Sequence, residues 1–245
     1  MNPNTVGIGL PHPLASPALS CYSVISSMTP RESSHPIRSF FKQLPMYAAY
    51  KQLGHYPDYW WWKLRGEPRR IPHLLKQRTV REYAQAFGLT TLVETGTYYG
   101  EMVAAVAPRF QRIYSIELDP RLAGMARKRF RNYSHVEIVE GDSQAAVPNL
   151  LPRLKEKCLW WLDAGYCGWV GRVGNRNRLS TELIAILADR ITDHVILMDD
   201  ADGVNGEGGS PTLEELIASI HANYPGRQVE VARNIIRITP QKLKV

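Results

Sequence analysis

The chain has 245 residues, of which 44% are hydrophobic and 22% are charged, as is typical of soluble globular proteins. This composition excludes fibrous, collagen-like and wholly disordered proteins, and the sequence contains no run of 18 apolar residues that would predict a transmembrane helix. The net charge of +7 comes from the N-terminal third: residues 1–90 hold 11 Lys or Arg against 4 Asp or Glu, whereas residues 91–245 hold 19 of each. The larger C-terminal part therefore has no electrostatic footprint for nucleic acid.

The three cysteines, Cys21, Cys158 and Cys167, cannot form a disulfide framework. This usage is typical of a reducing compartment. The N-terminus has no basic residue before Arg31, and prolines interrupt its apolar stretch, so it does not resemble a secretory signal. We therefore expect a cytoplasmic protein. The alternative is a lipoprotein cleavage site at Ala-Leu-Ser-Cys, residues 18–21, which here lacks its basic n-region.

The N-terminal third divides into two segments. Residues 1–35 are rich in Pro, Ser, Gly and Asn without apolar periodicity, which predicts a disordered or loosely packed tail. Residues 36–78 predict a helical, aromatic cover, with a helix over 37–53 that Pro45 bends and three consecutive tryptophans at 60–62. Three interpretations of this cover remain open: a segment packed on the main domain, a lid over the substrate, or an interfacial anchor in peripheral contact with a membrane.

The region 79–245 predicts a single cofactor-binding domain. Helices are expected at 79–87, 100–107, 120–130, 143–156, 180–190 and 211–223, and strands at 91–94, 112–117, 136–139, 158–162, 195–198, 229–232 and 235–238. Strand and helix alternate five times before two strands that are joined through Arg233-Asn234. This order predicts an α/β fold: a doubly wound, Rossmann-like, seven-stranded and mostly parallel sheet with a terminal antiparallel hairpin.

Ligands of such sheets bind beyond the carboxyl ends of the strands. The first strand is followed by the turn Glu94-Thr-Gly96-Thr97-Tyr98-Tyr-Gly100. Gly96 lets the backbone turn sharply and approach a ligand, and Gly100 lets the following helix pack closely on the sheet. A dinucleotide site would have three glycines as G-x-G-x-x-G, and Tyr98 stands where the middle glycine would be. A purely structural turn remains the alternative.

Acidic residues end the next two strands. Glu117 lies 21 residues after Gly96, where a carboxylate can accept both hydroxyls of a ribose. Gly141-Asp142-Ser143 ends the third strand, where Asp142 can accept a hydrogen bond from an adenine amine and Ser143 can cap the next helix. Together with the glycine turn, this order indicates a site for a nucleoside-containing cofactor.

These residues carry a family resemblance. The motifs Glu94-x-Gly96-x-x-x-Gly100, Glu117 and Gly141-Asp142 resemble the cofactor motifs of class I methyltransferases that use S-adenosylmethionine (SAM). The resemblance covers residues 79–240. The segments 162–166 and 196–201 are similar to methyltransferase-like proteins of glycan and natural-product biosynthesis clusters, and more distantly to metal-dependent sugar O-methyltransferases.

The resemblance implies a role for each position. Glu94 and Gly96 would border the methionine part of SAM, Glu117 would hold the ribose, and Asp142 would hold the adenine. Asp163 would lie beside the sulfonium and the acceptor as the catalytic group. The predicted cofactor-binding set is Glu94, Gly96, Thr97, Gly100, Glu117, Asp142 and Ser143. The chain departs from the common glycine-rich loop at Thr97 and Tyr98.

Three carboxylates predict a metal site. Asp163 ends the fourth strand, and Asp199 and Asp200 end the fifth. Because adjacent strand ends lie roughly 5 Å apart, these side chains can converge on Mg²⁺, which would lower the pKa of an acceptor oxygen. Without a metal, one Asp would cap the following loop and another would hold the cofactor amine. Lys76, expected just before the first helix of the domain, is a further candidate base.

The sequence therefore predicts a SAM-dependent methyltransferase that methylates a hydroxyl of a sugar or other small molecule, with or without Mg²⁺. The loop at 167–178 carries three arginines that can bind an anionic acceptor. The alternatives are a nicotinamide-dependent oxidoreductase and a non-catalytic Rossmann-like interaction module. A nucleic-acid partner is not expected, because Asp163-Ala-Gly-Tyr166 does not match the Asn/Asp-Pro-Pro-aromatic motif of amino-methyltransferases. The acceptor and the oligomeric state are not specified.

Overall fold

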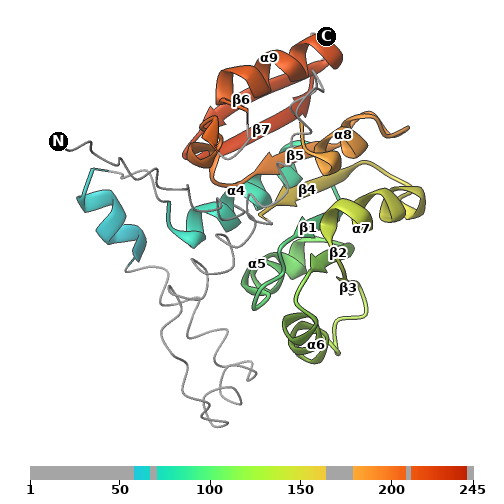
Figure 1. The fold of residues 1–245 in the computed structure, drawn as a ribbon. Helices are drawn as coiled ribbons and strands as arrows, with labels where there is room; N and C mark the ends of the chain where they lie inside the picture. Colours follow the sequence, from blue (N-terminus) through green and yellow to red (C-terminus); the bar gives the residue numbers. More distant parts are fainter. Residues whose placement is uncertain (1–57, 67–70, 164–178, 208–210, 242–245) are drawn as a thin grey trace, which may run out of the picture. The chain divides into compact units, whose positions relative to one another are not determined.

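The computed structural model describes residues 58–66, 71–163, 179–207 and 211–241. All of them belong to one compact unit, Lys42–Val245. Seven strands form one sheet in the order β3-β2-β1-β4-β5-β7-β6 (Figure 1). They are β1 (Thr91–Thr95), β2 (Arg112–Glu117), β3 (Val136–Glu140), β4 (Cys158–Leu162), β5 (Val195–Met198), β6 (Arg227–Ala232) and β7 (Ile235–Pro240). The first five pair in parallel and β7 is antiparallel to both β5 and β6, so the predicted fold class is confirmed.

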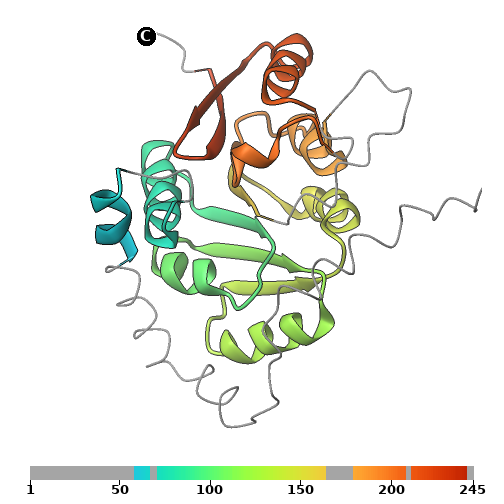
Figure 2. The same cartoon turned by 60° about the vertical axis from the view of Figure 1, so that its left-hand side comes forward.

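Helices cover both faces of the sheet (Figure 2). They are α4 (His73–Ala86), α5 (Glu101–Val106), α6 (Pro120–Arg129), α7 (Ser143–Leu150), α8 (Thr181–Leu187) and α9 (Leu213–Asn223). The region of α4, α5 and α6 packs with Trp161 in one hydrophobic cluster, and α7, α8 and α9 pack with Trp160 in the other. Successive strand side chains point to opposite faces. The adjacent tryptophans of β4 are therefore both fully buried, one in each cluster.

Several helix boundaries differ from the sequence prediction. The helix expected from residue 79 begins at His73, because the extended backbone of Pro72 forms its N-cap and Leu75 packs in the core. Lys76 is therefore inside this helix rather than before it. The helix expected over 143–156 ends at Leu150, because a 3₁₀ turn containing Pro152 follows at η3 (Leu151–Arg153).

Capping residues determine where α8 and α9 begin. Ser180 is the N-cap of α8, and its hydroxyl accepts the Leu183 N–H at 3.2 Å. The helix expected from Pro211 instead begins at Leu213, because Thr212 and Glu215 form a reciprocal capping box. Arg233 and Asn234 have φ values of 49° and 56°, as a tight two-residue hairpin requires.

Residues 58–64 form a short helix before α4. Trp62 is buried in the same cluster as Leu75, whereas Trp60 and Trp61 are 59% and 60% exposed. One tryptophan of the three therefore packs on the domain and two face outward. The predicted tail over 1–35 and the predicted helix over 37–53 lie outside the described residues. Among the described helices, none combines the length and the apolar character needed to cross a membrane.

Candidate functional site

The turn after β1 is held against β2. Gly96 and Thr97 donate their backbone N–H groups to the Ile116 carbonyl at 2.9 and 3.2 Å. A Cβ at Gly100 would lie 2.6 Å from Phe130, so glycine is required where the turn enters α5. Gly96, Tyr98 and Gly100 all have positive φ. Tyr98 adopts this conformation at a cost that glycine would not have, and its side chain is 62% exposed.

A buried polar network lies beneath this turn. The Thr97 and Ser115 hydroxyls are 2.6 Å apart, and the Ser115 hydroxyl donates to the Glu94 carboxylate. All three side chains are buried. Burial raises the pKa of Glu94 to about 8, more than the Ser115 hydrogen bond lowers it. The buried side chains of Glu94 and Thr97 thus support the turn. Ser115 was not singled out in the sequence; its only signal is a polar residue in a buried strand.

Backbone N–H groups of nearby residues orient the Glu117 side chain. Its carboxylate accepts the backbone N–H of Tyr98 at 2.7 Å and that of Asp119 at 2.9 Å. Although it ends β2, the residue is buried. These two bonds fix the carboxylate beside the glycine turn before any ligand arrives.

Asp142 caps α7, and its carboxylate accepts the Gln144 N–H at 3.0 Å. The prediction that Ser143 caps this helix is wrong: its hydroxyl instead donates to the carboxylate of Glu182 in α8. Burial raises the pKa of Glu182. The sequence showed Glu182 only as an acidic residue in the first turn of a helix, so its place beside the predicted adenine site was missed.

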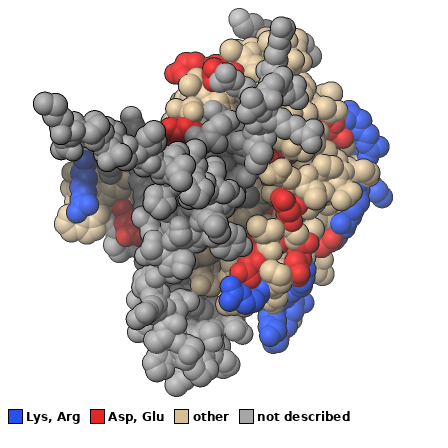
Figure 3. Space-filling model, in the orientation of Figure 1, with Lys and Arg blue, Asp and Glu red and all other residues tan. Residues whose placement is uncertain are grey.

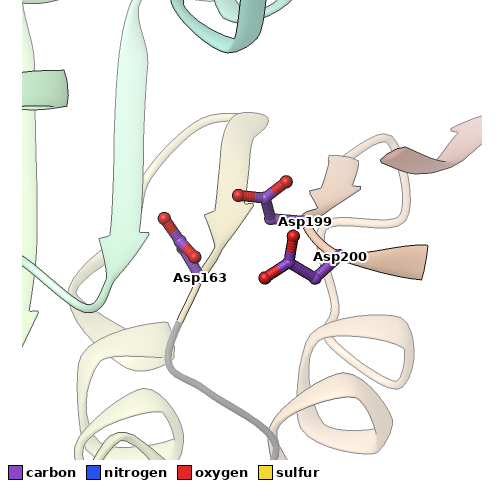
Figure 4. Close-up of side chains that lie close together, drawn as sticks. All are labelled: Asp163, Asp199 and Asp200. Carbon is purple, nitrogen blue, oxygen red and sulfur yellow. The ribbon is translucent and has the colours of Figure 1, made fainter. Parts of the chain in front are cut away.

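The structure brings the three aspartates of the predicted metal site together (Figure 4). The Asp163 N–H donates to Thr95 and the Asp199 N–H donates to Leu162, which aligns the ends of β1, β4 and β5. Asp163, Asp199 and Asp200 each offer one carboxylate oxygen within 4.8 Å of the others. We call these three residues the acidic trio. Asp199 is buried, and the other two are exposed.

Burial and mutual repulsion govern the electrostatics of the acidic trio. Burial, together with the charge of Asp199, raises the pKa of Asp163 to about 7 even though part of this residue is exposed to solvent. Burial also raises the pKa of Asp199. The Lys76 ammonium contacts Asp199 and lies 3.9 Å from an oxygen of Asp200. Burial acts to lower the pKa of Lys76, but the adjacent carboxylates outweigh it and the pKa is raised.

The hairpin between β6 and β7 fixes the segment that follows the trio. Asp200 has a left-handed φ of 54°, a conformation that Asp tolerates better than most residues. The Asn234 carbonyl accepts the Ala201 N–H at 2.9 Å, and its side chain exchanges two hydrogen bonds with Asp202, at 2.8 and 2.9 Å. Asn234 was interpreted from sequence only as a turn residue, yet it braces one side of the site.

Each predicted site residue therefore has a place at the carboxyl edge of the sheet. The turn, Glu117 and Asp142 lie at the ends of β1, β2 and β3, and the trio lies at the ends of β4 and β5. Three hard oxygen donors of this kind fit a divalent cation such as Mg²⁺. The arginine-rich loop proposed to bind the acceptor falls within 164–178, outside the described residues.

Comparisons with known proteins concern the fold of the chain. No family model matches the chain. A curated protein of Thermococcus onnurineus, a probable ribosomal RNA small subunit methyltransferase A, is 40% identical over 62 residues, which are 25% of this chain and only 22% of the relative. The SAH-bound methyltransferase PaMTH1 of Podospora anserina has a TM-score of 0.52 at 16% identity, covering 96% of this chain and 99% of its own.

Two further solved structures extend the likeness. An O-methyltransferase of Bacillus cereus in complex with SAH has a TM-score of 0.52 at 15% identity and covers 89% of this chain and 96% of its own. TomG of Streptomyces achromogenes, an O-methyltransferase of tomaymycin synthesis in complex with SAM, has a TM-score of 0.50 at 14% identity, with coverages of 90% and 95%. The chain has the Rossmann-like fold of class I methyltransferases.

Proposed function

We propose that this chain is a SAM-dependent methyltransferase that methylates a hydroxyl of a sugar or other small molecule with the assistance of a divalent cation. The observation that carries the proposal is the order of acidic residues along one sheet edge: Glu117 and Asp142 beside the glycine turn, and the acidic trio on the next two strands. The structural neighbours bound to SAM or SAH support the cofactor, and the O-methyltransferases among them support a hydroxyl acceptor.

In this proposal the first three strands bind the cofactor. The two carboxylate oxygens of Glu117 each already accept one backbone N–H and retain lone pairs for the ribose hydroxyls. Asp142 is exposed and can accept the adenine amine while it caps α7. Gly96 places backbone beside the methionine part. Glu94 and Thr97 support the turn through buried hydrogen bonds, and Ser143 bonds Glu182 beside the adenine position.

The next two strands would hold the acceptor. Methyl transfer is an in-line displacement at the sulfonium, so the protein contributes mainly by positioning the two reactants. The acceptor hydroxyl must also lose its proton. Asp163, whose pKa of about 7 lies near neutrality, is suited to accept that proton or to orient the hydroxyl. A divalent cation held by Asp163, Asp199 and Asp200 would supply a Lewis acid that lowers the pKa of the hydroxyl.

A second candidate function is methylation of ribosomal RNA, which the short match to the Thermococcus onnurineus protein favours. Two observations weigh against it. Residues 91–245 carry equal numbers of basic and acidic residues. On the face in Figure 3, acidic side chains lie beside the basic ones, and ion pairs such as Arg127–Glu140 at 2.8 Å neutralise some of them.

Calorimetric titration of the full chain with SAM and with NAD⁺ tests the proposed cofactor. We expect saturable binding of SAM and none of NAD⁺. The reverse result would favour the oxidoreductase, and binding of neither would favour an interaction module.

Transfer of labelled methyl from SAM tests the acceptor. The panel should contain sugars, small phenols and small-subunit ribosomal RNA, each assayed with excess chelator and again with added Mg²⁺. We expect a small hydroxyl compound to be labelled, with loss of label in chelator and recovery with Mg²⁺. Full labelling in chelator would remove the metal from the proposal, and labelling of RNA alone would replace the acceptor class.

The same proposal assigns segment 36–78 to the acceptor side as a cover, and residues 1–35 to a dispensable tail. Trp62 anchors the cover in the core, which leaves Trp60 and Trp61 exposed for contact with an acceptor. Replacing both exposed tryptophans with Ala should raise the acceptor KM and leave SAM affinity within about tenfold. If turnover is unchanged and the wild type sediments with anionic vesicles in a salt-sensitive way, the cover is an interfacial anchor instead.

A further inference from the structure

The ammonium group of Lys76 lies against the acidic trio. Lys76 comes from the second turn of α4, 123 residues before Asp199 in the sequence. Its ammonium contacts one oxygen of Asp199 and lies 3.9 Å from an oxygen of Asp200, and the charge of Asp163 also acts on it. The Lys76 side chain is 17% exposed and that of Asp199 only 1%. This pair is therefore held away from bulk water, where screening by solvent and salt is weak.

The spacing of the carboxylates accommodates an ammonium, and a small metal ion would draw them closer together. Oxygens bound to one Mg²⁺ at about 2.1 Å can lie no more than about 4.2 Å apart. One carboxylate oxygen from each member of the trio lies within 4.8 Å of the other two. An ammonium donates hydrogen bonds to carboxylate oxygens at about 2.7–2.9 Å, so it can bind a more widely spaced set of oxygens than Mg²⁺ does. A closed Mg²⁺ site would require these carboxylates to draw together.

The two cations also compete for the same carboxylate, that of Asp199. The Asp199 oxygen that contacts Lys76 belongs to the carboxylate at the buried centre of the trio. A divalent ion bound there would lie within a few ångströms of the ammonium and be repelled by it. We propose that Lys76 is a tethered competitor that weakens divalent-cation binding at the acidic trio and leaves Asp199 when a cation enters. This inference rests on the metal site of the proposed function.

The test is a titration of the full chain with Mn²⁺, followed by the electron paramagnetic resonance of the free ion. Lys76→Met removes the charge and keeps a long unbranched side chain. We expect it to bind Mn²⁺ at least about tenfold more tightly than the wild type, because a unit charge roughly 4 Å from the site is lost. Lys76→Arg, which keeps the charge, should stay nearer to wild-type affinity.

Two control variants locate the effect. Arg78→Met removes a charge from the exposed face of the same helix, where Arg78 pairs with Glu82, and should leave Mn²⁺ affinity unchanged. Asp199→Asn combined with Lys76→Met should abolish the tight binding. If Lys76→Met does not fold, Lys76→Gln takes its place. Equal or weaker Mn²⁺ binding by the uncharged variants, or no binding by any variant, would overturn the proposal.

Thermal unfolding gives a second readout that does not depend on activity. Without metal, Lys76→Met should unfold at a lower temperature than the wild type, because three carboxylates lose their internal cation. Added Mn²⁺ should raise the midpoint of the variant more than that of the wild type, because tighter ligands stabilise more at a given concentration. Equal metal-induced shifts would contradict the inference. Failure of the proposed function would appear separately, as a lack of SAM binding in a protein whose Mn²⁺ affinity still responds to Lys76.

Discussion

The two halves of the sheet's carboxyl edge hold their acidic side chains in different ways. At β2 and β3, Glu117 and Asp142 accept backbone N–H groups from residues close to them in the sequence or in the neighbouring turn. At β4 and β5, the acidic trio is brought together by strand register and balanced by Lys76 from a distant helix. Local hydrogen bonds fix the carboxylates at β2 and β3 in position without a ligand. The carboxylates at β4 and β5 repel one another, so a cation is needed to hold them together.

The largest effect is expected from a substitution in the acidic trio at β4 and β5. Asp199→Asn removes the buried member of the trio, and we expect methyl transfer to fall by about a hundredfold or more, because hydroxyl activation is lost. SAM affinity should stay within about tenfold, since the cofactor half is untouched. The matched control is Asp202→Asn, which alters a nearby carboxylate bound to Asn234 and should retain most activity. Equal losses in both variants would show that the trio has no special role.

The pH dependence of stability tests the buried network under the turn. The folded protein raises the pKa of Glu94 from 4.5 to about 8, so between these values it holds a proton that the unfolded chain releases. The free energy of unfolding should therefore fall as pH rises from about 5 to 8.5, by a few kcal/mol at about 1.4 kcal/mol per pKa unit. Glu94→Gln should flatten this slope in urea unfolding series. Parallel slopes for the two proteins would mean that Glu94 is ionised throughout.

Glu117→Ala tests the proposed cofactor site at the ends of β2 and β3. Losing the charged acceptor for the ribose hydroxyls should weaken SAM binding by about 1.5–3 kcal/mol. Part of that loss would come from the turn, because the Tyr98 N–H also loses its partner. Glu117→Gln keeps one acceptor oxygen and should recover part of the affinity. Calorimetry on folded protein provides the measurement, and wild-type affinity in Glu117→Ala would remove this residue from the site.

The smallest effect concerns the turn itself. Gly100→Ala places a methyl 2.6 Å from the buried Phe130 ring at a φ of 71°, and should lower the free energy of unfolding by about 1–3 kcal/mol. Gly124→Ala in α6 meets open space and should be neutral or stabilise by a few tenths of a kcal/mol. Urea unfolding compares the two. If both variants are equally stable, close packing at the turn is not what requires glycine at Gly100.

The contrast between the halves also explains what the sequence could predict. The strands, the glycine turn and the acids at the strand ends follow from periodicity and spacing, which are local properties. Lys76, Ser115 and Glu182 were misplaced or missed because each acts on a residue that is distant in sequence, over 123, 21 and 39 positions. Such contacts depend on how α4 and α8 pack on the sheet and on the pairing of β1 with β2. The helix ends that differed were decided by single prolines or by a capping pair, which periodicity does not register.

The brace at Asn234 has a consequence for biosynthesis. β7 lies between β5 and β6 in the sheet, so during synthesis on the ribosome β5 keeps an open edge until β7 has emerged. The segment after Asp200 likewise lacks its partner until Asn234 is made. A nascent or prematurely terminated chain would expose both an unpaired apolar strand, which favours aggregation, and a half-built acidic site. Completion of the site therefore depends on synthesis of the hairpin between β6 and β7.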